Sequence, residues 1–325
     1  MKSYWIRPEA GITVLESRDV PVPEPKAGEV LVRMRAAGLN RGELIARHGL
    51  HAKGGDAKRA GVEGAGEIAK LGAGVTGLKI GDRVMGRCNG AFAEYGVIDA
   101  REAVIVPANL SWEEAACVPL VFMVVHDMLI AQGHLKAGEW LLVTGVSSGV
   151  GVAALQTGKA LGAKVIGTSG SAEKLERLKG LGLDLALRTR KPDFCDAVMN
   201  ATGGKGANLI VNNVGGSVFA ECVRALAYEG RLATVGYLDG TMSAEIDIEA
   251  LHSKRLVLFG VSNKLRSAEQ RAETVRGFAA DIVPLIAAGK IKPLIDRVFP
   301  FAQLSEAKAM MESDVHLGKI AVRMD

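Results

Sequence analysis

The sequence predicts an α/β protein that combines a β-barrel-like domain with a doubly wound parallel sheet. Three observations support this fold class. The first hundred residues are rich in glycine and in short β-type runs. Residues 139–174 read as a strand, a tight turn of small residues, a helix and a second strand, which is one βαβ unit. Strands and helices then alternate to about residue 262, as in a parallel sheet with helices on both faces.

Four short strands are expected before residue 100. Within residues 28–38, Val30, Val32 and Met34 alternate with other residues in the manner of a half-buried strand. Two more, within 64–72 and 78–84, are closed by glycine turns, and another is expected within 91–98.

The alternating segment opens at Ser111, which forms with Glu114 the pattern of a helix-capping box. Strands are expected near 140–144, 164–168, 185–187, 208–214, 231–235 and 256–260. Helices are expected near 149–161, 172–181, 216–228 and 246–252. The tail should hold one long amphipathic helix at about 268–288, a short helix after Ser305 and a final strand over 318–323.

The turn between Gly145 and Gly151 is the strongest functional signal. It follows an apolar strand and opens a helix, so backbone N–H groups at the helix N-terminus can face a pyrophosphate. Aligned on G-x-G-x-x-G, the glycine positions are Val146, Ser148 and Gly151, and only the third is glycine. An ordinary strand-to-helix turn is the alternative. The complete strand–turn–helix–strand context favours a dinucleotide site.

Composition and charge exclude several classes of function. The formal net charge is +4 and its carriers are scattered; the densest patch, Arg188, Arg190 and Lys191, is interpreted as a solvated loop, so no nucleic-acid partner is expected. The four cysteines lack metal-finger spacing, which fits an intracellular enzyme with free thiols. The start has no apolar signal core, and the longest uncharged apolar run, 115–125, is too short to span a bilayer. We therefore expect a soluble, cytoplasmic protein without a membrane partner.

Six short motifs occur together in a recognisable order. They are Ala36-Ala-Gly-Leu-Asn40, Gly61-Val-Glu-Gly-Ala-Gly66, Gly81-Asp-Arg-Val84, residues 115–129, residues 146–162 and Leu317-Gly-Lys319. On these residues nearly the whole chain resembles the medium-chain dehydrogenase/reductase superfamily and, within it, the zinc-independent quinone oxidoreductase (ζ-crystallin-like) branch. The resemblance implies a GroES-like catalytic domain over 1–115 and 263–325 and a Rossmann NADPH-binding domain over 116–262.

The resemblance also bears on metal binding. Zinc-using relatives carry a Cys, a His and a third donor at the positions of Asn40, Val62 and Leu120, and none of these three residues is a good zinc ligand. The structural zinc lobe of those relatives would follow Val84, where this chain runs straight into the next expected strand. No metal site is therefore expected, and an alcohol dehydrogenase mechanism loses its main support.

The end of the second strand of the βαβ unit indicates which nicotinamide is used. NAD-preferring sites place an Asp or Glu there, and its carboxylate would repel a 2′-phosphate. This chain has Thr168, Ser169 and Ser171, followed by Lys174 inside the next helix, and hydroxyls with an ammonium favour a phosphate. The alternatives are a helix N-cap for Ser171 and a solvated surface lysine for Lys174. NADPH is the predicted cofactor.

Four side chains are implied to lie near the reacting atoms. Asn40 would lie beside nicotinamide and substrate, and Glu63 keeps the family carboxylate; a turn-capping Asn and a buried structural acid are the alternatives. His51 falls where relatives often carry a Tyr that faces the substrate, and its imidazole would protonate the product oxygen, although a lone loop His is usually inert. His126 falls where relatives often have an aromatic beside the nicotinamide, and Val124 replaces a common Thr.

The remaining predicted cofactor contacts belong to turns and strand ends, where ligands of parallel sheets bind. They are Ser147, Ser148, Gly149, Val150 and Gly151 in the turn, Val214, Gly236, Tyr237, Gly260 and Ser262 at the carboxyl edge of the sheet, and Gly318 and Lys319 from the tail.

Together these observations predict a zinc-free oxidoreductase that transfers hydride from NADPH to a small electron-poor substrate, either a quinone or an α,β-unsaturated carbonyl. A carbonyl or alcohol dehydrogenase is the nearest alternative enzyme. A non-catalytic NADPH-binding protein is the alternative from another class. A homodimer is expected, because the last strand of the parallel sheet, 256–260, is continuously apolar and would leave an unpaired edge.

Overall fold

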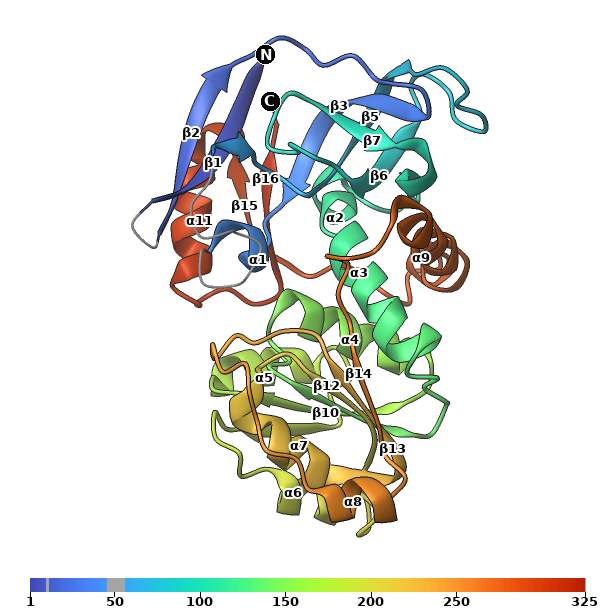
Figure 1. Ribbon diagram of the computed structural model, residues 1–325, viewed down its shortest axis with the longest axis vertical. Helices are drawn as coiled ribbons and strands as arrows, with labels where there is room; N and C mark the ends of the chain where they lie inside the picture. Colours follow the sequence, from blue (N-terminus) through green and yellow to red (C-terminus); the bar gives the residue numbers. More distant parts are fainter. Residues whose placement is uncertain (10–11, 46–55, 325) are drawn as a thin grey trace. The chain divides into compact units, whose positions relative to one another are not determined.

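Residues 1–9, 12–45 and 56–324 are described by the computed structural model, and the chain divides into two units (Figure 1). The first unit comprises Met1–Val121, Arg271–Ala279 and Pro293–Asp325, and the second comprises Phe122–Gln270 and Ala280–Lys292. The domain boundaries expected from the sequence, after residues 115 and 262, stay a prediction.

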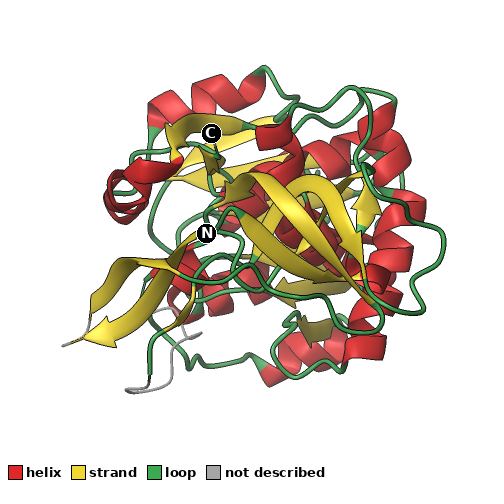
Figure 2. Ribbon diagram, turned by 90° about the horizontal axis from the view of Figure 1, so that it is seen from above, coloured by secondary structure: helices red, strands yellow, loops and turns green. Residues whose placement is uncertain are grey.

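The first unit is built on two sheets. The larger has the strand order β15-β16-β3-β5-β6-β8, with β7 also paired to β3, and the smaller has the order β2-β1-β4. All strand pairs are antiparallel except β15 with β16, which are parallel. In Figure 2 the hairpin of β1 and β2 starts at the N mark. The strands are β1 (Lys2–Glu9), β2 (Ile12–Asp19), β3 (Glu29–Gly38), β4 (Lys58–Arg59), β5 (Glu63–Leu71), β6 (Arg83–Arg87), β7 (Tyr95–Asp99), β8 (Val104–Ile105), β15 (Ile295–Pro300) and β16 (Lys319–Arg323).

Strand β3 is the centre of the larger sheet, because it pairs with β5, β7 and β16. Val30, Val32 and Met34 are buried, as predicted. The other face is mixed: Leu31 and Ala37 are buried, whereas Arg33 is exposed and Arg35 is partly exposed, so the predicted half-burial holds only at the two arginines. The helix α2 packs against β3.

The helices of the first unit are short. Ser111 and Glu114 form the predicted capping box: the Ser111 hydroxyl accepts from the Glu114 N–H at 3.2 Å, and the Glu114 carboxylate accepts from the Ser111 N–H at 2.9 Å. These elements are α1 (Arg41–Leu44), the 3-10 turn η2 (Ala100–Glu102), α2 (Trp112–Ala116), the 3-10 turn η5 (Phe301–Gln303) and α11 (Leu304–Glu312).

The second unit is a six-stranded sheet in which every pair is parallel, in the order β11-β10-β9-β12-β13-β14. The doubly wound parallel sheet predicted from the sequence is thereby confirmed. Its strands are β9 (Trp140–Thr144), β10 (Lys164–Ser169), β11 (Leu185–Arg188), β12 (Ala207–Asn212), β13 (Leu226–Thr234) and β14 (Val257–Gly260). Its helices include α4 (Gly149–Ala160), α5 (Ala172–Lys179), α6 (Cys195–Ala201), α7 (Phe219–Ala225) after the 3-10 turn η4 (Gly216–Val218), α8 (Ile248–Ser253) and α10 (Val283–Ala287).

Two further helices, α3 (Pro119–His126) and α9 (Ala268–Asp281), contain residues of both units, and the π-helix η3 (Asp127–Ala131) continues α3. The long tail helix predicted over 268–288 is wrong in its continuity. It is two helices, α9 and α10, and Pro284 lies at the start of the second, because proline lacks an N–H and is tolerated only in the first turn of a helix.

Three other local predictions need correction. The strand expected over 78–84 is realised only from Arg83, because Gly81 has a φ of +87° in a turn that the neighbouring residues share. The strand expected over 91–98 begins at Tyr95. Helix α6 and strands β1, β2, β4 and β8 were not predicted.

No helix in the described part of the chain is long and apolar enough to cross a membrane.

Candidate active site

Three of the predicted site residues meet at one edge of the first unit's larger sheet. Asn40 follows the end of β3, Glu63 begins β5 and Lys319 begins β16. Because β3 runs antiparallel to both β5 and β16, the end of β3 lies beside the beginnings of its two partners. The sheet register therefore brings together three residues that are up to 279 positions apart in sequence.

These three side chains form a closed, buried network. The Lys319 ammonium donates to Asn40 Oδ1 at 2.8 Å, to Glu63 Oε1 at 2.7 Å and to the Leu39 carbonyl at 2.7 Å. The Asn40 amide in turn donates to Glu63 Oε1 at 2.8 Å. Glu63 is fully buried, and the side chain of Lys319 is only 7% exposed. A buried ion pair of this kind is sustained by its surrounding hydrogen bonds, and here all three ammonium donors have acceptors.

The backbone completes this network around Glu63. The second carboxylate oxygen, Oε2, accepts from the Leu120 N–H at 2.7 Å. At Gly38 a Cβ would lie 2.7 Å from Glu63 Oε1 and 2.8 Å from the Ala116 carbonyl oxygen, so only glycine leaves room for the carboxylate. Gly318, just before Lys319, has a φ of +80° and would collide with the Leu294 carbonyl if it carried a side chain.

A fourth buried ionisable residue, Glu43, lies beside the network and was not predicted. It is on α1, three residues after Asn40, and accepts from the Gly61 N–H at 2.6 Å. The pKa of its carboxyl is raised to about 7: burial is the largest cause and the negative charge of Glu63 adds to it, against the opposing effects of the Gly61 N–H, Lys58 and Lys319. The only sequence signal was an acidic residue next to apolar Leu44, which alone predicts nothing.

The phosphate-binding turn of the second unit joins β9 to α4. Gly145 has a φ of +62°, and the Ser148 hydroxyl caps α4 by accepting from the Gly151 N–H at 3.0 Å. A Cβ on Gly151 would lie 2.5 Å from the Gly145 carbonyl oxygen, so the helix could not pack this closely on the turn. Gly151, the third position of the G-x-G-x-x-G pattern, is therefore a position where packing requires glycine. Val146 fills the space above Gly167, where a side chain would strike it.

Hydroxyl groups at the end of β10 hydrogen-bond to the turn between β9 and α4. Thr168 Oγ1 accepts from the Gly145 N–H at 3.2 Å, and the hydroxyls of Ser147 and Ser169 lie 3.1 Å apart. Ser171 caps α5 by accepting from the Lys174 N–H at 3.2 Å, so the N-cap interpretation of this serine is confirmed. The turn and the end of β10 therefore form one connected surface.

The carboxyl ends of the central strands carry an amide network that was not predicted. Asn213 donates through its side chain to the Thr144 carbonyl at 3.0 Å, and the Thr144 hydroxyl lies 3.2 Å from Asn212 Oδ1. Two consecutive asparagines directly after an apolar strand were the available signal. The predicted contact residues Val214, Gly236, Tyr237, Gly260 and Ser262 follow or end β12, β13 and β14, and so belong to this same carboxyl edge of the sheet.

Two predicted histidines have different outcomes. His126 ends α3, is buried, and lies with its Nε2 atom 2.8 Å from Asp281 Oδ2, so the ring is held by a carboxylate. Whether it contacts a nicotinamide stays a prediction. His51 lies outside the described residues.

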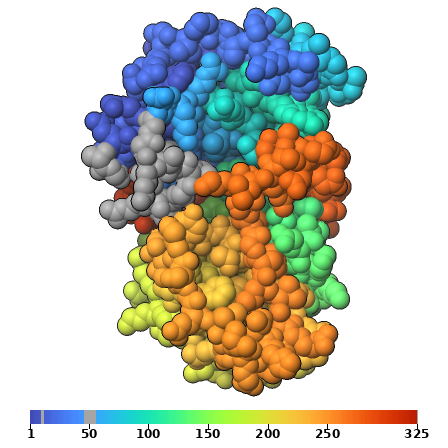
Figure 3. Space-filling model, in the orientation of Figure 1, coloured from blue at the N-terminus to red at the C-terminus, as the bar shows by residue number. Residues whose placement is uncertain are grey.

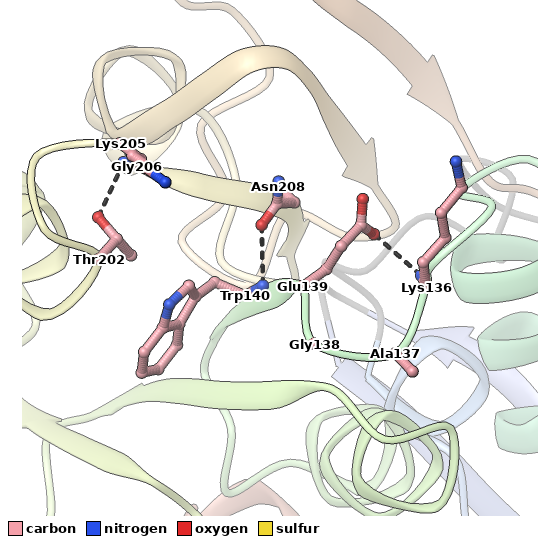
Figure 4. Close-up of a pocket in the computed structure, with 9 residues that line it drawn as sticks. All are labelled: Lys136, Ala137, Gly138, Glu139, Trp140, Thr202, Lys205, Gly206 and Asn208. Atoms are coloured by element: carbon pink, nitrogen blue, oxygen red, sulfur yellow. Dashed lines mark hydrogen bonds between the residues drawn. The ribbon is translucent and has the colours of Figure 1, made fainter.

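A hollow of about 520 Å³ lies at the opposite, amino edge of the same sheet (Figure 4). Trp140 begins β9 and Asn208 is the second residue of β12, and a hydrogen bond of 2.9 Å runs from the Trp140 N–H to Asn208 Oδ1. Ligands of open parallel sheets bind at the carboxyl ends of the strands, so this hollow is not the dinucleotide site. Its lining is Lys136, Ala137, Gly138, Glu139, Trp140, Thr202, Lys205, Gly206 and Asn208.

Comparison with known proteins identifies the family. Residues 26–108 match the family described as alcohol dehydrogenase GroES-like domain, and residues 149–276 match the family described as zinc-binding dehydrogenase. A crystal structure of an NAD-dependent alcohol dehydrogenase is 30% identical, with 100% of both chains covered and a TM-score of 0.87. The chain therefore belongs to the medium-chain dehydrogenase/reductase family.

Two further relatives have names that refer to reduction or to oxidation and reduction. The structure of Escherichia coli quinone oxidoreductase complexed with NADPH is 27% identical, covers 99% of this chain and 100% of its own, and has a TM-score of 0.88. A highly reducing polyketide synthase of Alternaria alternata is 30% identical over 94% of this chain. This chain spans only 12% of that synthase's length.

The family description names zinc, and the residues present here do not fit it. Among the described residues, no group of three or more His, Cys, Asp or Glu side chains is arranged to hold a metal ion. Asn40 has both side-chain polar atoms bonded within the network, and the adjacent ammonium of Lys319 would repel a divalent cation. No step of the chemistry is therefore routed through zinc.

Proposed function

We propose that the protein is a zinc-independent, NADPH-dependent oxidoreductase that reduces a quinone or an α,β-unsaturated carbonyl. The observation that carries this proposal is the buried network of Asn40, Glu63 and Lys319. It occupies the place in the sheet where zinc-using relatives need their first ligands, and it is internally satisfied without a metal.

The second unit supplies the features that a dinucleotide needs. The start of α4, with Ser148 and Gly149–Gly151, presents small residues at the positive end of a helix dipole and would hold the pyrophosphate. Ser169, instead of a carboxylate, ends β10, so a 2′-phosphate would meet no negative charge from that residue. When bound, NADPH supplies the hydride.

The network acts on the reaction by position. Lys319 uses its three N–H groups on acceptors of the protein, so it holds Asn40 in one orientation and is not available as a proton donor. The two Nδ2 hydrogens of Asn40 are used on the Gly38 carbonyl and on Glu63 Oε1, so Asn40 has no donor left for a substrate oxygen, and the network acts by fixing the shape of the sheet edge against which the substrate lies. Protonation of the product oxygen by His51 stays a prediction.

An alcohol dehydrogenase is the second candidate, and the similarity to the NAD-dependent alcohol dehydrogenase structure favours it. The reducing activities named for the quinone oxidoreductase and polyketide synthase relatives favour a reductase instead. Steady-state assays of purified protein separate these candidates. NADPH consumption with a panel of quinones and enones supports the proposal, whereas turnover confined to alcohols with an oxidised cofactor contradicts it. Cofactor binding without any turnover would favour a non-catalytic role.

We also propose that two copies pair through strand β14. This strand stands at one end of the six-stranded order, as the orange edge strand in Figure 1 shows, and its segment contributes to the surface in Figure 3. Val257 on β14 is 52% exposed, and Tyr228 on the adjacent β13 is 62% exposed. An apolar, unpaired strand edge is a template for pairing with an identical strand.

A further inference from the structure

Glu43 connects the two strand ends that carry Asn40 and Glu63. Its backbone N–H donates to the Asn40 carbonyl at 3.1 Å, and its side chain accepts from the Gly61 N–H at 2.6 Å, two residues before Glu63. Glu43 is 3% exposed, so its carboxylate lies in the interior. One residue of α1 therefore holds the end of β3 against the beginning of β5.

The Gly61 end of this connection is fixed by the backbone. Gly61 has a φ of +100°, and a Cβ there would lie 2.6 Å from the Ala91 nitrogen. Its carbonyl accepts from the N–H groups of Gly90 at 2.8 Å and Ala91 at 3.0 Å. The carbonyl side of Gly61 is therefore bonded to the backbone and its N–H side to Glu43. A change at Glu43 acts on the position of Glu63 through this short segment.

The elements packed around Glu43 carry several titratable groups. They are Lys58 and Arg59 of β4, Glu63 of β5, Cys88 after β6, Lys319 of β16, Arg41 of α1 with its partner Asp314, and, on α11, Glu306 and the ion pair of Lys308 with Glu312. The pKa of the Cys88 thiol is raised to about 12, chiefly by burial, so this group stays neutral. Lys58 is exposed to solvent, whereas Lys319 is buried. Glu43 and Glu63 therefore share one buried cation, the Lys319 ammonium.

The proton on Glu43 decides the net charge of this cluster. With the proton in place, Glu63 and Lys319 form a neutral ion pair. Without it, two buried carboxylates face one buried ammonium, and the cluster becomes negative. The pKa of the Glu43 carboxyl, raised to about 7 chiefly by burial, places this change between roughly pH 6 and 8.

We propose that Glu43 is a positioning residue of the reductase and that the site works with this carboxyl uncharged. This inference rests on the proposed function. In that reaction the substrate accepts a hydride from NADPH, which leaves NADP⁺. The two electrons reduce the conjugated system, and negative charge develops on the substrate oxygen until a proton from solvent neutralises it. A second carboxylate charge beside the network of Asn40, Glu63 and Lys319 opposes this developing charge.

The test is a pH profile of kcat and KM on the full chain, with NADPH and an accepted quinone or enone as substrates. Glu43→Gln keeps a side-chain oxygen that can accept from the Gly61 N–H, and it cannot ionise. Wild-type kcat should fall roughly 3- to 10-fold from pH 6 to pH 8, the effect of one added charge near the site, and Glu43→Gln should abolish that fall. The KM for NADPH should differ by less than about twofold between the two proteins, since uniform cofactor binding is not what this charge affects.

Two further variants complete the test. Glu43→Ala removes the bond to Gly61 and should lower kcat roughly 5- to 50-fold at pH 6, where the wild-type carboxyl is uncharged as well. Glu67→Gln removes one charge from the same strand, β5, at a partly exposed position paired with Arg35, and should retain the wild-type profile. If Glu43→Ala does not fold, the comparison of wild type with Glu43→Gln still decides the inference.

The outcomes separate this inference from the function on which it rests. The same fall of kcat in wild type and Glu43→Gln, or no fall in wild type, overturns the role of Glu43 and leaves the proposed reductase standing. A folded Glu43→Ala protein that melts at a lower temperature but keeps its kcat at pH 6 overturns the positioning role, because the residue then supports only the fold. A wild type that turns over no quinone or enone overturns the proposed function, and this inference falls with it.

Discussion

Replacing Glu43 with Gln should stabilise the protein at neutral and alkaline pH, by an amount that disappears in acid. Burial is the main reason that the pKa of this carboxyl rises from an ordinary 4.5 to about 7. Glu63 adds to that rise, whereas the Gly61 N–H, Lys58 and Lys319 oppose it. Glutamine retains the shape of the protonated acid and cannot ionise.

The sign and size follow from proton linkage. Between pH 4.5 and 7 the unfolded chain has lost the proton while the folded chain holds it, so stability falls as pH rises through this window. Below pH 4.5 both states are protonated and there is no penalty; above about 7 the full penalty remains. A pKa difference of about 2.5 corresponds to about 3 kcal/mol, of which about 2.5 kcal/mol develops between roughly pH 5 and 8.

Denaturant unfolding followed by tryptophan fluorescence measures this, because Trp5 and Trp112 belong to the same unit as Glu43. The difference in unfolding free energy between Glu43→Gln and wild type should grow by about 2.5 kcal/mol from pH 5 to pH 8. Glu67→Gln, which removes an acid on a partly exposed face paired with Arg35, controls for the loss of one charge. If the unfolding free energies of wild type and Glu43→Gln changed in parallel from pH 5 to pH 8, the reasoning would be refuted.

Three other predictions follow from the site and the sheet edge. Lys319→Met should lower the unfolding free energy by about 3–5 kcal/mol, because it leaves the Glu63 carboxylate buried without its cation. Adding Glu63→Gln should restore part of the loss. An unchanged denaturation midpoint for Lys319→Met would contradict the buried ion pair. Purified protein should carry no stoichiometric zinc and keep its reductase activity with a chelator present, and one tightly held zinc per chain in metal analysis would exclude this. Light scattering at micromolar concentration should give a dimer that Val257→Lys dissociates, whereas a wild-type monomer would refute pairing through β14.

Local sequence signals predicted the second unit well. Its strands are apolar, its helices α4 and α5 begin at the caps Ser148 and Ser171, and its turns are short, so these elements are each encoded within about twenty residues. The misses are of two kinds. Helix α6 has no capping side chain to mark its start. The tail helix was expected to continue because its apolar period does, although Pro284 starts a new helix there.

The site residues were predicted one by one and mostly through family resemblance. The sequence could not show that Asn40, Glu63 and Lys319 bond to one another, because sheet pairing over long separations leaves no local pattern. Glu43 was missed since a single acid in a four-residue helix is usually exposed. Arg190 was interpreted as part of a solvated loop, and the structure places it, exposed, in the turn after β11.

The most direct test of zinc-independent reduction measures the transfer of deuterium from the cofactor to the product. Metal-depleted protein is given an enone and NADPH deuterated at the transferable position of the nicotinamide, and the product is examined by mass spectrometry. A zinc-independent reductase should place one deuterium on the β-carbon of the product at the same rate with and without added zinc. Transfer that appears only after zinc is added, or no transfer to any quinone or enone while the bound cofactor stays reduced, would contradict the account.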